Sequence, residues 1–160
     1  MSEQSPYMTH PKRLADIIAA IQLMGTYKFG SRSVENWEKS IGRPPLSAEN
    51  WTKIFDDHPE FFRVKDGFGS LVWRRAKKRN HDTVSGRDLS TEELKALDKD
   101  AKGKLTRRPL DPSQVEALMN SAIKMHSSAI AHNKELRWMV PTIASLSGVV
   151  VGAYLRYLFS

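Results

Sequence analysis

The feature that most constrains this chain is a long uncharged stretch at its C-terminal end, WMVPTIASLSGVVVGAYLRYLF, residues 138–159. No charged residue lies between Arg137 and Arg156, and those 18 positions would rise about 27 Å as an α-helix. The hydrocarbon core of a bilayer is about 30 Å thick. Trp138 and Tyr154 stand near the two ends, where amphipathic rings prefer the membrane interfaces. We therefore expect a single transmembrane helix over 138–159, with a buried core helix as the alternative.

The charges around this stretch predict its orientation. Lys124, Lys134 and Arg137 precede it, and only Arg156 follows. Because positive residues favour the cytoplasmic side, we expect a membrane protein with one span and a cytoplasmic N-terminal domain. The span comes last in the chain, so insertion would follow synthesis, as in tail-anchored proteins.

Small residues recur at every fourth position inside the predicted span: Ala144, Gly148 and Gly152. Such a face allows two helix backbones to approach closely. It predicts a homodimer through the transmembrane helix or packing on another membrane protein, although the same spacing also arises by chance in apolar helices.

The charge of the chain is concentrated in one place. The 160 residues carry a formal net charge of +7, and the run RRAKKR, residues 74–79, holds five basic residues and no acidic one. The rest of the chain is therefore close to neutral. The sequence has no cysteine, which excludes disulfides, thiolate catalysis and cysteine-based zinc sites.

Three helices are expected before residue 60. Apolar residues at helical spacing predict the first, capped by Thr9 or His10 and ended by Gly25, after a disordered arm over residues 1–8. Ser33 would begin the second and Gly42 would end it. Ser47 would begin the third, whose buried face includes Trp51.

Two short β-type runs follow, residues 61–65 and 70–74, on either side of Asp66-Gly67, which is a strong hairpin signal. Three helices followed by a hairpin is the order of a winged helix-turn-helix. Residues 9–75 resemble a winged-helix domain, and the segments THPKRLADIIAAIQLMGTYKF, HPEFFRV and LVWRR resemble small uncharacterised bacterial proteins that share this unit. The resemblance covers less than half of the chain and implies no active site.

The second half of the chain reads as a linker and a stalk. Residues 76–110 are basic and polar and contain one short helix, 91–102, opened by the capping box Ser90 to Glu93. Residues 111–137 form a longer amphipathic helix with a thin apolar seam. This stalk would be a short coiled coil, lie on the membrane surface, or fold back on the head. The expected fold class is thus mainly α with a small β-hairpin: a winged-helix-like head, a long amphipathic helix and one transmembrane helix.

The sequence argues against an enzyme and predicts no cofactor. The five histidines lack metal-ligand spacing, and no phosphate-binding loop or nucleophile motif is present. Asp56, Asp57 and Glu60 form an acidic group near the end of the third helix, where solvated carboxylates are the ordinary interpretation.

Nucleic acid is the other partner considered. In a DNA-binding winged domain the third helix would read bases, here through Glu49, Asn50, Thr52 and Lys53, with Asn50 placed to pair with adenine. Contacts to phosphates or lipid headgroups would come from six basic residues: Lys65, Arg74, Arg75, Lys77, Lys78 and Arg79. The predicted third helix is net acidic, however, and its negative charge opposes the binding of phosphates.

Two functions therefore remain open. The favoured one is a non-enzymatic adaptor, tethered to membrane lipid, whose cytoplasmic winged-helix head binds a protein partner. The alternative is a membrane-anchored, DNA-binding transcriptional regulator.

Overall fold

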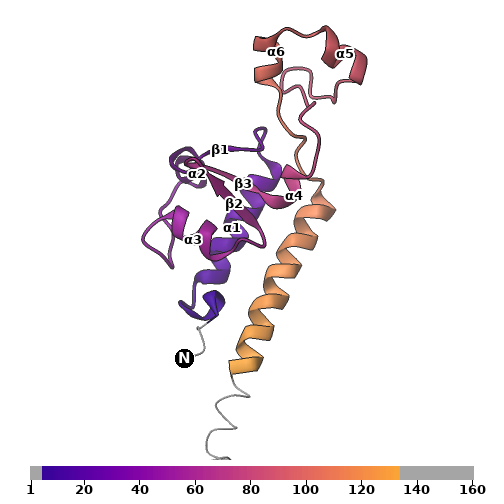
Figure 1. Cartoon of the computed structure of the whole chain (residues 1–160). Coiled ribbons are helices and arrows are strands. Elements are labelled where there is room, and N and C mark those ends of the chain that lie inside the picture. The colour runs from indigo at the N-terminus through magenta and orange to yellow at the C-terminus, as the bar shows by residue number, and fades with distance from the viewer. Residues whose placement is uncertain (1–4, 134–160) are drawn as a thin grey trace, which may run out of the picture.

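The computed structural model describes residues 5–133, which are mainly helical with a small antiparallel sheet (Figure 1). In chain order the elements are η1 (Pro6–Met8), α1 (Arg13–Thr26), β1 (Arg32–Ser33), α2 (Val34–Ile41), α3 (Trp51–Asp57), β2 (Phe62–Lys65), β3 (Phe68–Leu71), α4 (Val72–Arg75), α5 (Thr91–Ala96) and α6 (Lys99–Lys104), followed by a long helix over residues 112–133. The predicted transmembrane helix over 138–159, with its small-residue face, lies outside the described residues.

The N-terminal segment is more ordered than the polar sequence predicts. Pro6–Met8 form a turn of 3-10 helix, and the Tyr7 side chain is buried in the core. Its ring lies 4.6 Å from that of His58, centroid to centroid, in an edge-on contact. The prediction of disorder over residues 1–8 is therefore wrong for residues 5–8, because tertiary packing supplies the order that local sequence does not.

Two of the three head helices begin later than the sequence predicts. Helix α1 begins at Arg13, after Lys12 rather than after the predicted caps Thr9 or His10, and continues through Gly25 to Thr26. Helix α3 begins at Trp51, not at Ser47, because Ser47 donates from both its backbone N–H and its hydroxyl to Asp16. Helix α2 agrees with the prediction: Ser33 caps its first turn, and Gly42 ends it in the left-handed conformation that glycine adopts readily.

The hairpin forms at the predicted turn but with a shifted second strand. Asp66 and Gly67 both have positive φ, at 52° and 76°, as a two-residue type I′ turn requires. Strand β3 therefore starts directly after the turn and ends at Leu71, so the predicted strand over 70–74 is wrong in its second half, where α4 forms. A third strand, β1, adds to the hairpin, and the sheet order is β1-β3-β2.

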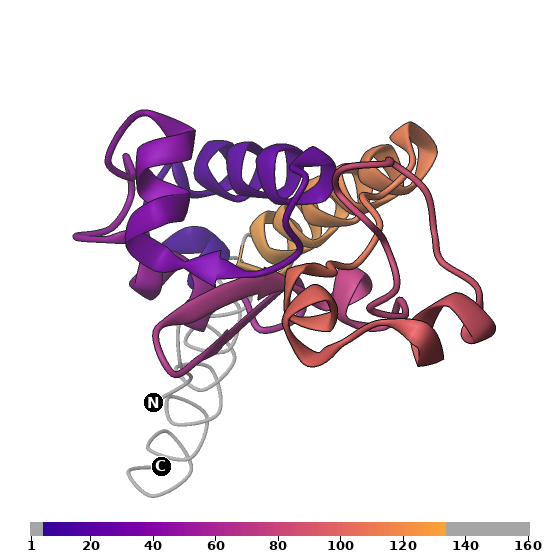
Figure 2. The same ribbon diagram turned by 90° about the horizontal axis from the view of Figure 1, so that it is seen from above.

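The long helix packs on the head. Its residues Val115, Leu118 and Ala122 are buried in the same core as Ile17 and Ile21 of α1. Seen from above, the long helix and α1 lie side by side (Figure 2). Of the three arrangements left open for the stalk, the described part of this helix adopts the one that folds back on the head.

Residues 80–106, called the arm here, project beyond the head at the end where the long helix begins (Figure 1). The arm leaves and returns through backbone pairing of His81 with Thr106, and the capping box of Ser90 and Glu93 is present at the start of α5. The single predicted helix over 91–102 is divided, since α5 ends at Ala96 and Asp98 caps the new helix α6.

Candidate binding site at the arm end

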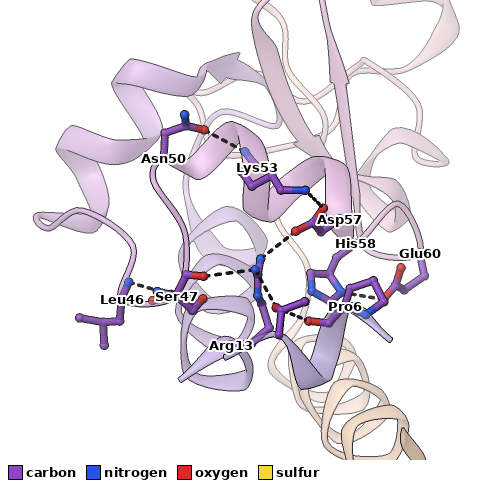
Figure 3. Close-up of polar contacts among 11 residues, drawn as sticks. Pro6, Arg13, Leu46, Ser47, Asn50, Lys53, Asp57, His58 and Glu60 are labelled. Atoms are coloured by element: carbon purple, nitrogen blue, oxygen red, sulfur yellow. Dashed lines mark hydrogen bonds and ion pairs between the residues drawn. The ribbon is translucent and has the colours of Figure 1, made fainter. Parts of the chain in front are cut away.

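The predicted recognition helix uses several of its polar groups internally. The Asn50 side chain accepts a hydrogen bond from the Lys53 N–H at 2.9 Å and so caps α3. The Lys53 ammonium pairs with Asp57 at 2.5 Å, as Figure 3 shows. Thr52 is half-buried, and Glu49 is exposed beside this cap. The exposed charge that α3 adds to its surroundings is therefore mainly acidic.

Arg74, one of the predicted phosphate contacts, is instead fully buried. Its guanidinium donates to the carbonyl oxygens of Met24, Tyr27 and Phe29, at 2.6–3.1 Å, and to that of Arg107 at 2.5 Å. Burial, and then the charge of Arg107, lower the pKa of Arg74 to about 10, so the group stays charged at neutral pH. The assignment of Arg74 to phosphate or lipid is wrong, because all of these carbonyls belong to the protein.

The rest of the basic run divides into held and free groups. The Lys77 ammonium donates to the Pro109 carbonyl and to the Gln114 side chain, which ties the run to the start of the long helix. The side chains of Arg75 and Lys78 are exposed and make no hydrogen bond or ion pair with any other described residue, and the same holds for the Lys65 side chain on β2.

Arg79 lies at the base of the arm and is fixed by the backbone. Its Nε donates to the Leu105 carbonyl at 2.7 Å, and its Nη2 donates to the Gly103 carbonyl at 2.8 Å. Both acceptors are uncharged carbonyl oxygens, so the charge of the Arg79 guanidinium is not neutralised by an ion pair.

A basic hollow of about 440 Å³ opens beside Arg79. Its cations are Arg79, Lys104 and Arg107, and no carboxylate lines it. The walls also include two aromatic residues, Phe29 and Phe68, and the Phe68 side chain is 52% exposed at the start of β3. We call this cavity the basic hollow.

The Arg107 side chain, like that of Lys104, makes no hydrogen bond or ion pair in the described chain. Its Nε is buried and has no hydrogen-bond partner within residues 5–133. Burial, followed by the charges of Arg75 and Arg79, lowers the pKa of the Arg107 guanidinium. The positive charges of Arg75 and Arg79 therefore repel that of Arg107, and no carboxylate lines the basic hollow to offset this repulsion.

A second cavity, which we call the apolar hollow, lies under the arm and has a volume of about 650 Å³. Its apolar lining comes from Phe29 and from six side chains of the arm: Val84, Leu89, Ala96, Leu97, Ala101 and Leu105. It shares Phe29, Lys104 and Leu105 with the basic hollow, so the two cavities adjoin. Val84 is 94% exposed, which leaves a large apolar side chain at the edge of the cavity in contact with water.

The charged groups on the apolar hollow are already paired with one another. Arg87 forms a two-point ion pair with Glu93, at 2.5 and 3.1 Å, and this pairing and the Ser90 N–H lower the pKa of Glu93 to about 2. Asp82 accepts hydrogen bonds from the Val84 and Ser85 N–H groups and the Ser85 hydroxyl within its own turn. Lys104 alone among the charged lining residues makes no such contact in the described chain.

Apart from Arg79, which the basic run marked as a possible phosphate contact, the sequence did not indicate the residues that line these hollows. Lys104 and Arg107 lie in a segment without periodicity, which was predicted to be linker. The Gly30 N–H donates to the Thr106 hydroxyl across 76 positions of sequence, and contacts at this separation assemble the site. A run of basic residues before Pro109 was the only local signal, and it does not specify a cavity.

Within residues 5–133, no group of histidine and carboxylate side chains is arranged to hold a metal ion. In the same part of the chain, no helix has the length and apolar character needed to cross a bilayer. A comparison of the chain with models of known protein families, with curated proteins and with solved structures found no match.

Proposed function

We propose that this protein is a membrane-tethered adaptor whose winged-helix head binds a protein partner at the arm end. The observation that carries the proposal is the apolar hollow, which leaves Val84 exposed and Leu89 and Leu97 only half-buried, beside cations of the basic hollow that form no ion pair in the described chain. A partner segment with an apolar anchor residue and adjoining acidic residues would complement both features. The order α1-β1-α2-α3-β2-β3 supports the winged-helix assignment.

The charge on α3 favours a protein partner over DNA. Asp56 and Glu49 are exposed there, and Lys53 is neutralised by Asp57. Attraction of phosphates by basic side chains supplies most of the non-specific affinity for nucleic acid. A surface with an acidic excess at the position of the recognition helix lacks that attraction.

The long helix supports a particular arrangement at the membrane. Its 22 described residues, 112–133, span about 33 Å, at about 1.5 Å per residue. The arm lies at its first end, while Tyr7 contacts Met125 and His126 toward the other. A transmembrane span at 138–159 would thus attach the head at the end opposite the arm, and Arg75 and Lys78 would face a partner rather than the lipid.

The partner site is tested by photo-crosslinking of the full chain in cells. A photoreactive residue replaces Val84 at the apolar hollow, and the control position is Leu46, which is 45% exposed in the loop before α3. We expect a discrete crosslinked protein from position 84 and none from position 46. The product, once identified, should lose about tenfold or more in affinity for the Leu97→Asp variant, because a charge would enter an apolar contact. Equal crosslinking from both positions contradicts the proposal.

Two further measurements examine the tether and the alternative function. Recovery of the full chain in the soluble fraction after carbonate washing would contradict the membrane span. Binding of the detergent-solubilised chain to random duplex DNA, with a steep salt dependence that disappears when Arg75 and Lys78 are changed to Gln, would favour the membrane-anchored DNA-binding regulator instead.

A further inference from the structure

We propose that the basic hollow is a binding site for a phosphoryl group carried on an aromatic or other apolar body. The inference concerns Arg79, Lys104 and Arg107 together with the walls formed by Phe29 and Phe68. It is separate from the partner site proposed for the apolar hollow, and the two are tested with different probes.

The Arg79 guanidinium is held in place by the protein before any ligand binds. Two backbone carbonyls, those of Gly103 and Leu105, hold the Arg79 guanidinium and leave its Nη1 without a hydrogen-bond partner in the described chain. A guanidinium held in this way loses little side-chain entropy when it receives an anion.

The Arg107 guanidinium has hydrogen-bond donors that no described residue accepts. Gly30 permits the close packing here, since a Cβ on it would lie 3.3 Å from the Arg107 Cβ and 3.4 Å from the Arg74 Nε. The Gly30 N–H also donates to Thr106 at 3.0 Å, which joins the loop after α1 to the end of the arm. Burial in this packing leaves the Arg107 Nε without an acceptor among residues 5–133. The Nε atoms of Arg13 and Arg74 are also buried without an acceptor, but those two guanidinium groups make other hydrogen bonds, whereas the Arg107 side chain makes none in the described chain.

The charges that line the basic hollow favour an anionic ligand. Three cations line the cavity, and the described chain supplies no carboxylate there. A phosphate monoester carries a charge of about −1.5 to −2 at neutral pH and offers three acceptor oxygens, so it satisfies more of these groups than one carboxylate does. The repulsion that lowers the pKa of Arg107 would be relieved by such an anion.

The size and the aromatic walls of the basic hollow favour an apolar group attached to the phosphate. The volume of about 440 Å³ falls within the range of about 300–1,000 Å³ that is usual for small-ligand sites. Phe68 exposes 52% of its side chain at one wall, and Phe29 belongs to both hollows. An aromatic ring attached to the phosphate would cover this apolar surface.

The test is calorimetric titration of the detergent-solubilised full chain with phenyl phosphate. Inorganic phosphate removes the ring, phenyl sulfate reduces the charge to −1, and adenosine monophosphate and a phosphotyrosine peptide represent the two sources of such a group. We expect phenyl phosphate to bind at least about fivefold more tightly than inorganic phosphate or phenyl sulfate. The tighter of the last two probes identifies the source.

Matched variants assign the binding to this cavity. Arg107→Gln is expected to weaken phenyl phosphate binding about tenfold or more, since a charge-assisted contact is lost. Arg108→Gln, at the neighbouring exposed position paired with Asp111, should change it less than about twofold. If Arg107→Gln fails to fold, Lys104→Gln is compared with Lys102→Gln, because both lysines lie on α6 and only Lys104 lines the cavity.

Three results would overturn the proposal. The first is no binding of phenyl phosphate at millimolar concentration, and the second is an equal loss of binding in the variant and in its matched control. The third, from a parallel titration with an oligonucleotide, is tighter binding of the oligonucleotide than of phenyl phosphate with no loss in the Arg107→Gln variant. The crosslinking from Val84 does not depend on any of them. Failure here and failure of the adaptor proposal are therefore distinguishable.

Discussion

Asp16 is fully buried in α1, yet its carboxylate has four donors around it. The backbone N–H groups of Leu46 and Ser47 and the Ser47 hydroxyl donate to one oxygen at 2.7–2.9 Å, and Arg43 pairs with the other at 2.8 Å. A buried charge is tolerated when it is paired and fully hydrogen-bonded. Asp16 thereby fixes the loop between α2 and α3 on the first helix.

Arg13 has a similar role one turn earlier in α1. Figure 3 shows its guanidinium between Asp57 and the Ser47 carbonyl. The Thr9 hydroxyl is a further acceptor, at 3.0 Å. Its side chain is 3% exposed, so the ion pair with Asp57 at 3.2 Å is shielded from solvent on that side. Arg13 thereby ties the start of α1 to the end of α3 and to the loop before α3.

Arg74→Met should be severely destabilising. The substitution keeps much of the side-chain volume but removes the donors for four carbonyl oxygens, three at the end of α1 and in the segment after it and one on Arg107. We expect a loss of about 3–5 kcal/mol in the free energy of unfolding, as for the removal of one partner from other buried charged networks. Denaturant titration measures it.

Two companion variants make the Arg74 result specific. Arg74→Lys retains the charge but presents one ammonium instead of a planar fork, so we expect about half of that loss. Arg75→Met changes an exposed residue with no partner in the described chain and should cost less than about 0.5 kcal/mol. Similar effects at both positions would contradict the structural role of Arg74.

At the scale of elements, the main event is the docking of the long helix on α1. Gly25 lies in the last turn of α1, where a Cβ would come 3.0 Å from Cγ2 of Val115. Leu110, just before the long helix, donates its N–H to the Gly25 carbonyl. Glycine is present here because the other chain approaches closely, not because the helix ends.

Gly25→Ala therefore sets two effects against each other. Alanine favours α1 by about 1 kcal/mol, while overpacking against Val115, whose branched side chain is stiff, costs about 1–3 kcal/mol. We expect a net loss of about 1 kcal/mol in the free energy of unfolding. In a Val115→Ala background the clash is absent, so the same change should be stabilising. A double-mutant cycle without coupling would contradict this contact.

The whole molecule is closed by a cluster that joins three distant segments. The Tyr7 hydroxyl donates to Glu60 at 2.7 Å, and His58 Nδ1 lies 3.0 Å from the same carboxylate oxygen. The Tyr7 hydroxyl also lies 3.4 Å from the Met125 sulfur on the long helix. The N-terminal turn, the end of α3 and the long helix thus meet at the end opposite the arm.

This cluster predicts how stability depends on acid. Burial by itself would raise the pKa of Glu60, but the hydrogen bonds from His58 and Tyr7 outweigh it and hold the pKa below the ordinary value of 4.5. The carboxylate therefore stabilises the fold above pH 4.5, and this contribution is lost as the pH falls through the lower pKa of the folded state.

Tyr7→Phe should lower the free energy of unfolding by about 1 kcal/mol at pH 7, and the difference from the unmodified chain should shrink as the pH falls from 5 to 3. Urea titrations across that range measure it. Tyr27→Phe is the control, because the Tyr27 hydroxyl makes no hydrogen bond in the described part of the chain. A difference that is constant with pH would contradict the link to Glu60.

Features that depend on neighbours a few positions apart could be predicted from the amino-acid pattern alone. The cap at Ser33, the glycine end at Gly42, the turn at Asp66-Gly67 and the capping box at Ser90 are present where the pattern predicts them. Each is a hydrogen bond or a backbone preference within a single turn, so the residues that decide it are adjacent in the chain.

The roles of the basic run and of the arm depend on contacts between distant segments of the chain. Arg74 is a structural anchor while Arg75 is free, although the two are adjacent and of the same type, because one faces the carbonyls at the end of α1 and the other faces solvent. Lys104 and Arg107 meet Phe29 and Phe68 through contacts across more than 30 positions. Charge and type are local properties of a residue, whereas burial and unmet hydrogen bonds arise only when distant segments pack together.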